Sequence, residues 1–230
     1  MKTIGLIGGM SWESTVTYYQ LINEYVKQAL GGLHSAKLLL YSVDFAEIEA
    51  CQAAGDWDRS AALLTGAARS LERAGADFLV ICTNTMHKVA PQVQAGVDIP
   101  LLHIAQATAR ALTARGVERT ALLGTRYTMT QDFYKDSLRQ AGIQVLVPHG
   151  GDIELVNRVI YNELCLGLCR EESRQEYRRI IGGLAEEGAQ AVVLGCTEIG
   201  LLIRPEDSPI PVFDTTRIHA EAAARMALEE

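Results

Sequence analysis

An internal repeat is the feature of this sequence that most constrains its fold. The run Ile4–Gly8, followed by Tyr18, matches the run Thr120–Gly124, followed by Tyr134, at a shift of 116 residues. Two further matches follow in the same order, at shifts of 113 and 111 residues: Ala76–Thr83 with Ala189–Cys196, and Ile99–Leu102 with Ile210–Phe213. Ordered matches at a nearly constant shift predict two copies of one structural unit.

Short apolar runs alternate with longer segments of helical periodicity in both copies. The predicted strands are Thr3–Ile7, Lys37–Val43, Phe78–Cys82, Leu101–Ile104, Thr120–Leu123, Gln144–Val147, Ala191–Leu194 and Val212–Phe213. The predicted helices are Ser14–Leu30, Arg59–Ala74, Ala105–Ala114, Thr130–Gln140, Asp152–Asn162, Glu172–Glu187 and Arg217–Leu228. This alternation is typical of βαβ units with parallel sheets buried on both faces. The predicted fold class is α/β, with two similar parallel-sheet, Rossmann-like domains related by pseudo-two-fold symmetry.

The repeat also predicts the domain organisation and the place of the active site. Residues 1–105 and the final helical segment, 214–230, form the first predicted domain, and residues 106–213 form the second. Ligands of open parallel sheets bind at the carboxyl ends of the strands. We therefore expect an active site in the cleft between the two domains.

Composition narrows the class of partner. The chain has 230 residues, of which 48% are hydrophobic, enough for the cores of two compact domains. Its net charge is −7 and its Lys and Arg residues are dispersed, which disfavours nucleic acid and anionic membranes. No apolar run is long enough to span a membrane. The five cysteines form no regular framework, as expected in a reducing compartment. These features favour a cytoplasmic protein that binds a small molecule.

Cys196 is the strongest candidate for a reactive group. It lies just past the apolar run Ala191–Leu194, at a predicted strand end that leads into a helical turn. Backbone N–H groups and a helix dipole favour a thiolate, so this setting predicts a thiol pKa below its free value of about 8.5. A purely structural cysteine is the alternative, but the neighbouring Thr197 and Glu198 favour a reactive one.

Thr83 occupies the position equivalent to Cys196 in the first copy. Groups on opposite faces of one carbon can remove a proton from one side and return one from the other, which is the chemistry of racemisation. A threonine hydroxyl is too basic to be ionised near neutral pH, so Thr83 cannot be an ordinary proton-abstracting base. The two faces are therefore predicted to be chemically unequal.

Residues around Thr83 have several open roles. Successive side chains of an extended segment point to opposite sides, so Cys82 is predicted to face the core if Thr83 faces the site. His87 lies four residues after Thr83, one helical turn away, where it could support the site electrostatically, form a capping hydrogen bond, or serve the structure alone. Cys165 and Cys169 are predicted to share a helix face, and core packing is favoured over metal binding because no further ligands complete a site.

Polar groups at the strand ends predict recognition of a carboxylate without a cofactor. Asn84, Thr85, Thr125 and Thr197 can donate hydrogen bonds alongside backbone amides. The sequence has no Gly-x-Gly-x-x-Gly pattern and no Walker-type loop. None of its lysines is marked as a Schiff-base residue. No cofactor and no metal are expected.

Together these residues resemble the aspartate/glutamate racemase family, which works without pyridoxal phosphate. The resemblance spans nearly the whole chain and rests on Gly8-Gly9-Met10, Asn84-Thr85-x-His87, Gly124-Thr125, Tyr134 and Gly195-Cys196-Thr197-Glu198. It implies two similar α/β domains with a cysteine each at a shared cleft, and a homodimer. It also implies that Cys196 removes the proton from the L-enantiomer, with Met10, Gln52 and Glu198 among the substrate contacts.

Two departures from the family pattern bear on activity. The family usually has cysteine where this chain has Thr83, which predicts a preference for L-amino acids, with Thr83, a water or a relay returning the proton. Aspartate racemases also tend to carry an arginine and a lysine for the side-chain carboxylate. Here Gln52 and Cys165 stand in those regions.

The leading hypothesis is therefore an L-preferring racemase acting on L-aspartate or L-glutamate. A broad-specificity racemase of neutral or basic amino acids is one alternative. A single-cysteine isomerase or decarboxylase of a dicarboxylic acid is a second, and a non-catalytic amino-acid-binding protein is a third.

Overall fold

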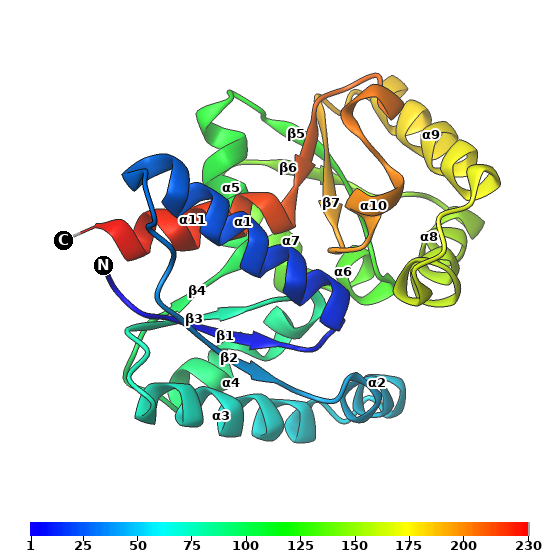
Figure 1. Cartoon of the computed structure of the whole chain (residues 1–230). Helices are drawn as coiled ribbons and strands as arrows, with labels where there is room; N and C mark the ends of the chain where they lie inside the picture. The colour runs from blue at the N-terminus through cyan, green and yellow to red at the C-terminus, as the bar shows by residue number, and fades with distance from the viewer. Residues whose placement is uncertain (230) are drawn as a thin grey trace. The chain divides into compact units, whose positions relative to one another are not determined.

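The computed structural model describes residues 1–229 of the chain (Figure 1). The residues divide into two compact units: Met1–Ile104 together with the segment from His219 onward, and Ala105–Ile218. None of the described helices is long and apolar enough to cross a membrane.

The first unit is built on a four-stranded parallel sheet in the order β2-β1-β3-β4. Its strands are β1 (Ile4–Gly8), β2 (Leu38–Ser42), β3 (Phe78–Ile81) and β4 (Leu101–Leu102). The central strands β1 and β3 are buried along their whole length, which explains their uninterrupted apolar sequences.

The second unit repeats this topology. Its strands are β5 (Arg119–Gly124), β6 (Gln144–Leu146), β7 (Ala191–Gly195) and β8 (Val212–Asp214), all parallel, in the order β6-β5-β7-β8. Each strand takes the place that its repeat partner holds in the first sheet. The prediction of an α/β protein with two similar parallel sheets is confirmed. The pseudo-two-fold relation and the shared cleft stay predictions.

Two helical layers enclose the first sheet. The helices of this unit are α1 (Trp12–Leu30), α2 (Phe45–Ala54), α3 (Trp57–Arg73), the 3-10 helix η1 (Thr85–Val89), α4 (Ala90–Ala95) and the last turns of α11 (Thr215–Leu228). Helix α1 buries Tyr18, Ile22 and Val26, one helical turn apart, against β1 and β3 in a cluster that includes alanines of α11. Helices α3 and α4 bury apolar side chains in a second cluster with Ile7, Leu79 and Ile81.

The second unit carries more short helices. They are α5 (Ile104–Ala114), α6 (Arg126–Thr130), α7 (Asp132–Gln140), α8 (Gly151–Asn162), η2 (Leu164–Leu166), α9 (Glu171–Glu186), α10 (Ile199–Leu202) and η3 (Pro205–Asp207). Its core joins β5 and β7 to α8, α9 and α10. After β4 the chain passes into this unit at α5, and after β8 it returns to the first unit within α11.

The prediction that Cys165 and Cys169 share a helix face is wrong. Cys165 lies in the 3-10 helix η2, and Cys169 follows in irregular backbone after the left-handed Gly167 ends that helix. Cys165 packs against the core of the second unit, as expected. Cys169 is exposed, so core packing was wrong for that residue.

Candidate functional site

Cys196 lies one residue past the end of β7, at the carboxyl edge of the second sheet. Its side chain is buried, and its Sγ donates a hydrogen bond to Oε2 of Glu198 over 2.9 Å. The hydroxyl of Thr197 donates to the same carboxylate oxygen over 2.7 Å. The turn that makes these contacts possible is closed by the bond from Ile199 N–H to the Cys196 carbonyl, over 3.1 Å. The structure therefore pairs the thiol with a buried carboxylate.

This pairing reverses the expected direction of the thiol pKa. Burial raises the pKa of Cys196 well above its ordinary value, and the charge of Glu198, the neighbouring Cys165 and the hydrogen bond to Glu198 raise it further. The expectation of a lowered pKa is wrong because it counted the backbone dipoles and left out desolvation and the adjacent negative charge. In addition, α10 spans only Ile199–Leu202, too short to supply a full helix dipole.

Close backbone approach explains the glycine that precedes Cys196. A Cβ on Gly195 would lie 3.0 Å from the Leu123 carbonyl oxygen, and a Cβ on Gly124 would lie 2.8 Å from the Gly195 carbonyl oxygen. These two glycines end the paired strands β5 and β7 in register. Their contact sets the Thr125 and Cys196 loops beside each other at one edge of the second sheet.

Thr125 begins the loop next to Cys196. Its hydroxyl accepts the Thr128 N–H over 3.4 Å and caps α6, and it lies 3.2 Å from the Thr128 hydroxyl. The predicted role of Thr125 in carboxylate binding is untested, but the cap fixes where its side chain lies. The loop ends where α6 begins at Arg126, four residues before the predicted helix start at Thr130.

Tyr177 and Cys165 also belong to the surroundings of Cys196. The Tyr177 pKa is raised well above its ordinary value, first by burial and then by the charges of Cys196, Glu163 and Cys165. The phenol donates to the Val156 carbonyl over 2.9 Å. Sequence reasoning missed Tyr177, because a tyrosine on the buried face of α9 gives the same pattern as a core residue.

Thr83 lies just past β3, at the carboxyl edge of the first sheet. It is half-buried, whereas the preceding Cys82 is fully buried. Burial raises the pKa of the Cys82 thiol, which forms a weak hydrogen bond with the Val80 carbonyl oxygen over 4.0 Å. The prediction that Cys82 faces the core is confirmed.

The residues after Thr83 form a short 3-10 turn. Asn84 and Thr85 are buried at its start, and His87 is 1% exposed within it. Nδ1 of His87 lies 2.8 Å from the Thr83 carbonyl oxygen, and η1 has no side-chain cap hydrogen bond, so His87 contacts the loop backbone without capping the helix. Its role in the site stays a prediction.

Met10 and Gln52 lie near this loop within the first unit. Met10 belongs to the same buried cluster as Met86, the residue after Thr85. Gln52 is buried on α2 and donates from Nε2 to Sδ of Met86 over 3.1 Å. Sequence reasoning missed Met86, which no polar pattern marks. The roles of Met10 and Gln52 as substrate contacts stay predictions.

Among residues 1–229, no group of three or more His, Cys, Asp or Glu side chains is arranged to hold a metal ion.

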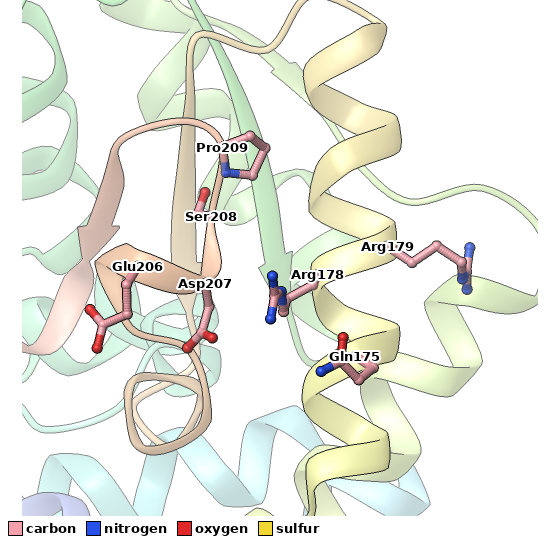
Figure 2. Close-up of a pocket in the computed structure, with 7 residues that line it drawn as sticks. All are labelled: Gln175, Arg178, Arg179, Glu206, Asp207, Ser208 and Pro209. Carbon is pink, nitrogen blue, oxygen red and sulfur yellow. The ribbon is translucent and has the colours of Figure 1, made fainter.

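A surface cavity of about 560 Å³ lies elsewhere on the second unit, between α9 and the η3 loop (Figure 2). Arg178 points toward the loop that carries Asp207, and Arg179 points away from it. The latter forms an ion pair with Asp152 over 2.6 Å. None of the predicted site residues lines this cavity.

Comparison with known proteins identifies the family to which this chain belongs. The sequence profile of the Asp/Glu/Hydantoin racemase family matches residues 7–223. The chain belongs to this family, and it is therefore an isomerase of the racemase type.

Three relatives illustrate the similarity. A Yersinia pestis protein provisionally designated an Asp/Glu racemase is 57% identical, with a TM-score of 0.93 over 100% of both chains. An aspartate racemase homologue from Pyrococcus horikoshii OT3 is 37% identical, with a TM-score of 0.86 over 100% of both chains. The broad specificity amino-acid racemase RacX of Bacillus subtilis is 23% identical over 225 residues, which cover 95% of each protein.

Proposed function

We propose that this protein is a cofactor-independent, L-preferring racemase that moves the Cα proton of L-aspartate or L-glutamate, with Cys196 and Thr83 as its two proton-handling residues. The observation that carries the proposal is the 2.9 Å hydrogen bond from the Cys196 thiol to the Glu198 carboxylate. A buried thiol joined to a buried carboxylate has a proton acceptor in direct contact, which an inert core cysteine lacks.

The Cys196 and Glu198 pair would act as a unit on the L-enantiomer. In the resting pair the thiol keeps its proton, since its pKa is raised. Transfer of that proton to Glu198 forms a thiolate while the total charge of the pair stays the same. The thiolate then takes the Cα proton, and the substrate ammonium offsets the negative charge of the site. The bond from Thr197 holds the carboxylate oxygen in place for this exchange.

Thr83 would serve the other face as the proton donor. Its neutral hydroxyl donates a proton to the carbanion, the alkoxide left behind takes a proton from water, and Glu198 releases the former thiol proton to solvent. As long as it keeps its proton, the hydroxyl is too weak a base to abstract the Cα proton of the D-enantiomer at neutral pH. This asymmetry favours reaction that starts from the L-enantiomer. The prediction from the internal repeat, that both strand-end loops serve one substrate, is part of the proposal.

A broad-specificity racemase is the second candidate. Gln52 and Cys165 carry no positive charge at positions where the family resemblance implies cations for an acidic side chain. The Bacillus subtilis relative is named a broad specificity amino-acid racemase. These two observations favour testing neutral and basic amino acids beside aspartate and glutamate.

The test is deuterium incorporation at Cα in deuterium oxide, followed by proton NMR, with chiral chromatography of the products. A panel of L- and D-amino acids is incubated with the wild type, with Cys196→Ser, and with Cys169→Ser as a matched control at an exposed thiol. We expect exchange from L-aspartate or L-glutamate that Cys196→Ser abolishes and Cys169→Ser leaves unchanged. Exchange confined to neutral or basic amino acids favours the second candidate. Absence of exchange from every amino acid contradicts both.

A further inference from the structure

Three histidines gather around the Thr83 loop in the first unit, and the proposed chemistry uses none of them. The ring centres of His87 and His103 lie 4.6 Å apart, and those of His87 and His219 lie 5.6 Å apart. His87 and His219 are buried. Two buried imidazoles and one half-buried imidazole therefore lie together beside the Thr83 loop.

The hydrogen bonds of His87 define its tautomer. A carbonyl oxygen only accepts, so Nδ1 must carry the proton that it donates to Thr83 O over 2.8 Å. Nε2 must carry a lone pair, because it accepts the Ile104 N–H over 3.2 Å. His87 is therefore a neutral imidazole that joins the Thr83 backbone to the first residue of α5.

His219 is fixed in the opposite tautomer. Its Nε2 donates to the Leu102 carbonyl over 2.9 Å, and its Nδ1 accepts the Tyr18 hydroxyl proton over 2.9 Å. Burial lowers the pKa of His87 well below its ordinary value, and the nearby His103 and His219 lower it further. The surroundings thus keep His87 in the neutral form that its two hydrogen bonds require.

The second unit has no equivalent of this imidazole. The shift of 113 residues that relates Thr83 to Cys196 places Gly200 opposite His87. A Cβ on Gly200 would lie 2.9 Å from Oδ2 of Asp214, so that space is filled by a carboxylate. The imidazole therefore belongs to the Thr83 loop alone, which is the loop that lacks a thiol.

We propose that His87 is the positioning residue of Thr83: its Nδ1–H holds the Thr83 carbonyl and thereby sets where the threonine hydroxyl lies when the proton returns to Cα. This role rests on the proposed function. Thr83 follows β3 in an irregular bend, so no strand ladder fixes its carbonyl. Misplacing a reacting group by about 1 Å can cost on the order of 10²-fold in rate, which makes one backbone bond consequential.

Two amide variants of His87 test its two hydrogen bonds one at a time. In His87→Asn the side-chain NH2 falls near the place of Nδ1 and can still donate to Thr83 O. In His87→Gln the amide reaches the place of Nε2, so it can meet Ile104 N–H but leaves the Thr83 carbonyl without its donor. Both variants remove the ring, so a merely structural role predicts equal losses.

The assay uses the most active L-amino acid of the panel in deuterium oxide. It compares two products: the D-amino acid, formed by inversion, and L-amino acid that has gained deuterium at Cα with its configuration retained. The measured quantity is the ratio of the first to the second. Exchange with retention reports on Cys196, and inversion reports on Thr83. We expect His87→Asn to keep a ratio within about threefold of the wild type. We expect His87→Gln to lower the ratio by on the order of 10²-fold while exchange persists. Equal ratios in the two variants overturn the proposal.

Two further results distinguish a failure of the His87 proposal from a failure of the proposed function or of folding. If the wild type exchanges no amino acid, the proposed function fails before His87 is tested. If both variants fail to fold, nitrogen-15 NMR of the wild-type imidazoles decides the question. A neutral His87 with its proton on Nδ1 at pH 7 is the expected result, and a proton on Nε2 or an imidazolium overturns the proposal.

Discussion

At the scale of single residues, the hydrogen bond between Cys196 and Glu198 is expected to affect both proton exchange and the thiol pKa. Glu198→Gln removes the negative charge and the proton acceptor beside the thiol. We expect Cα exchange from L-substrates to fall by about 10²–10⁴-fold, the range that a general base contributes. We also expect the thiol pKa to fall, because the Glu198 charge is one of the causes that raise it.

The two effects can be measured on the same samples. The pH dependence of iodoacetamide alkylation reports the thiol pKa, and NMR reports exchange. Glu187→Gln is a matched control, since Glu187 pairs with the exposed His149 and makes no contact with the thiol. An alkylation profile of Glu198→Gln that matches the wild type or moves to higher pH contradicts this account.

The residues of the site were predictable to different degrees. Cys196, Thr83 and His87 stand out in the sequence because each lies within a few residues of the end of a buried apolar run. The bond between Cys196 and Glu198 was not predictable, since it depends on the tight turn that precedes α10. The sign of the thiol pKa was missed for a related reason: sequence reveals neighbours in the chain but not how fully they are desolvated.

At the scale of elements, Tyr18 and Tyr134 allow a comparison between the two copies. Both are fully buried repeat partners. Tyr18 donates to Nδ1 of His219 over 2.9 Å, and Tyr134 donates to the Thr108 hydroxyl over 3.1 Å. We expect Tyr18→Phe to lower the free energy of unfolding by about 1–3 kcal/mol, because it removes the donor to a buried ring nitrogen.

Tyr134→Phe is the matched variant. Its partner is a hydroxyl that can rotate toward other groups, so we expect a smaller loss of about 0.5–1.5 kcal/mol. Urea unfolding followed by circular dichroism measures both. A larger loss for Tyr134→Phe than for Tyr18→Phe would show that the tautomer assigned to His219 is wrong.

The elements themselves were largely predictable, since every predicted strand is present within one or two residues of its observed bounds. Helix α1 begins at Trp12, before the predicted Ser14, because the Ser11 hydroxyl accepts the Ser14 N–H and caps the helix. Helix α2 was missed because the apolar residues of Phe45–Ala54 are spread around its axis and give no helical period. Short helices such as η1 and α10 follow from tertiary contacts and leave little trace in sequence.

At the scale of the whole molecule, the buried histidines predict how stability depends on pH. Burial lowers the pKa of His103 from its ordinary 6.5 to about 4 and lowers that of His87 as well. Between about pH 4 and 6.5 the unfolded chain therefore binds more protons than the folded one. It follows that the free energy of unfolding rises with pH in this window, so the protein becomes less stable as the pH falls through it.

Asp214 acts in the opposite direction. Burial raises its pKa above the ordinary 3.8, so its contribution to stability decreases as the pH rises just above that value. Urea unfolding at pH 5, 6 and 7 measures the net effect of these groups, in which His87 and His103 together oppose the single Asp214 carboxyl. We expect stability to increase across this series in the wild type, and to increase less steeply in His103→Gln, which removes one titrating ring.

His149→Gln is the control for this series, because His149 is 74% exposed in its side chain and lies outside the cluster. A slope equally steep in His103→Gln would mean that His103 binds protons in the folded state, and a flat wild-type slope would mean that the whole cluster does. That result would also remove the neutral His87 on which the positioning of Thr83 depends, so the stability series and the inversion assay test one physical state by independent means.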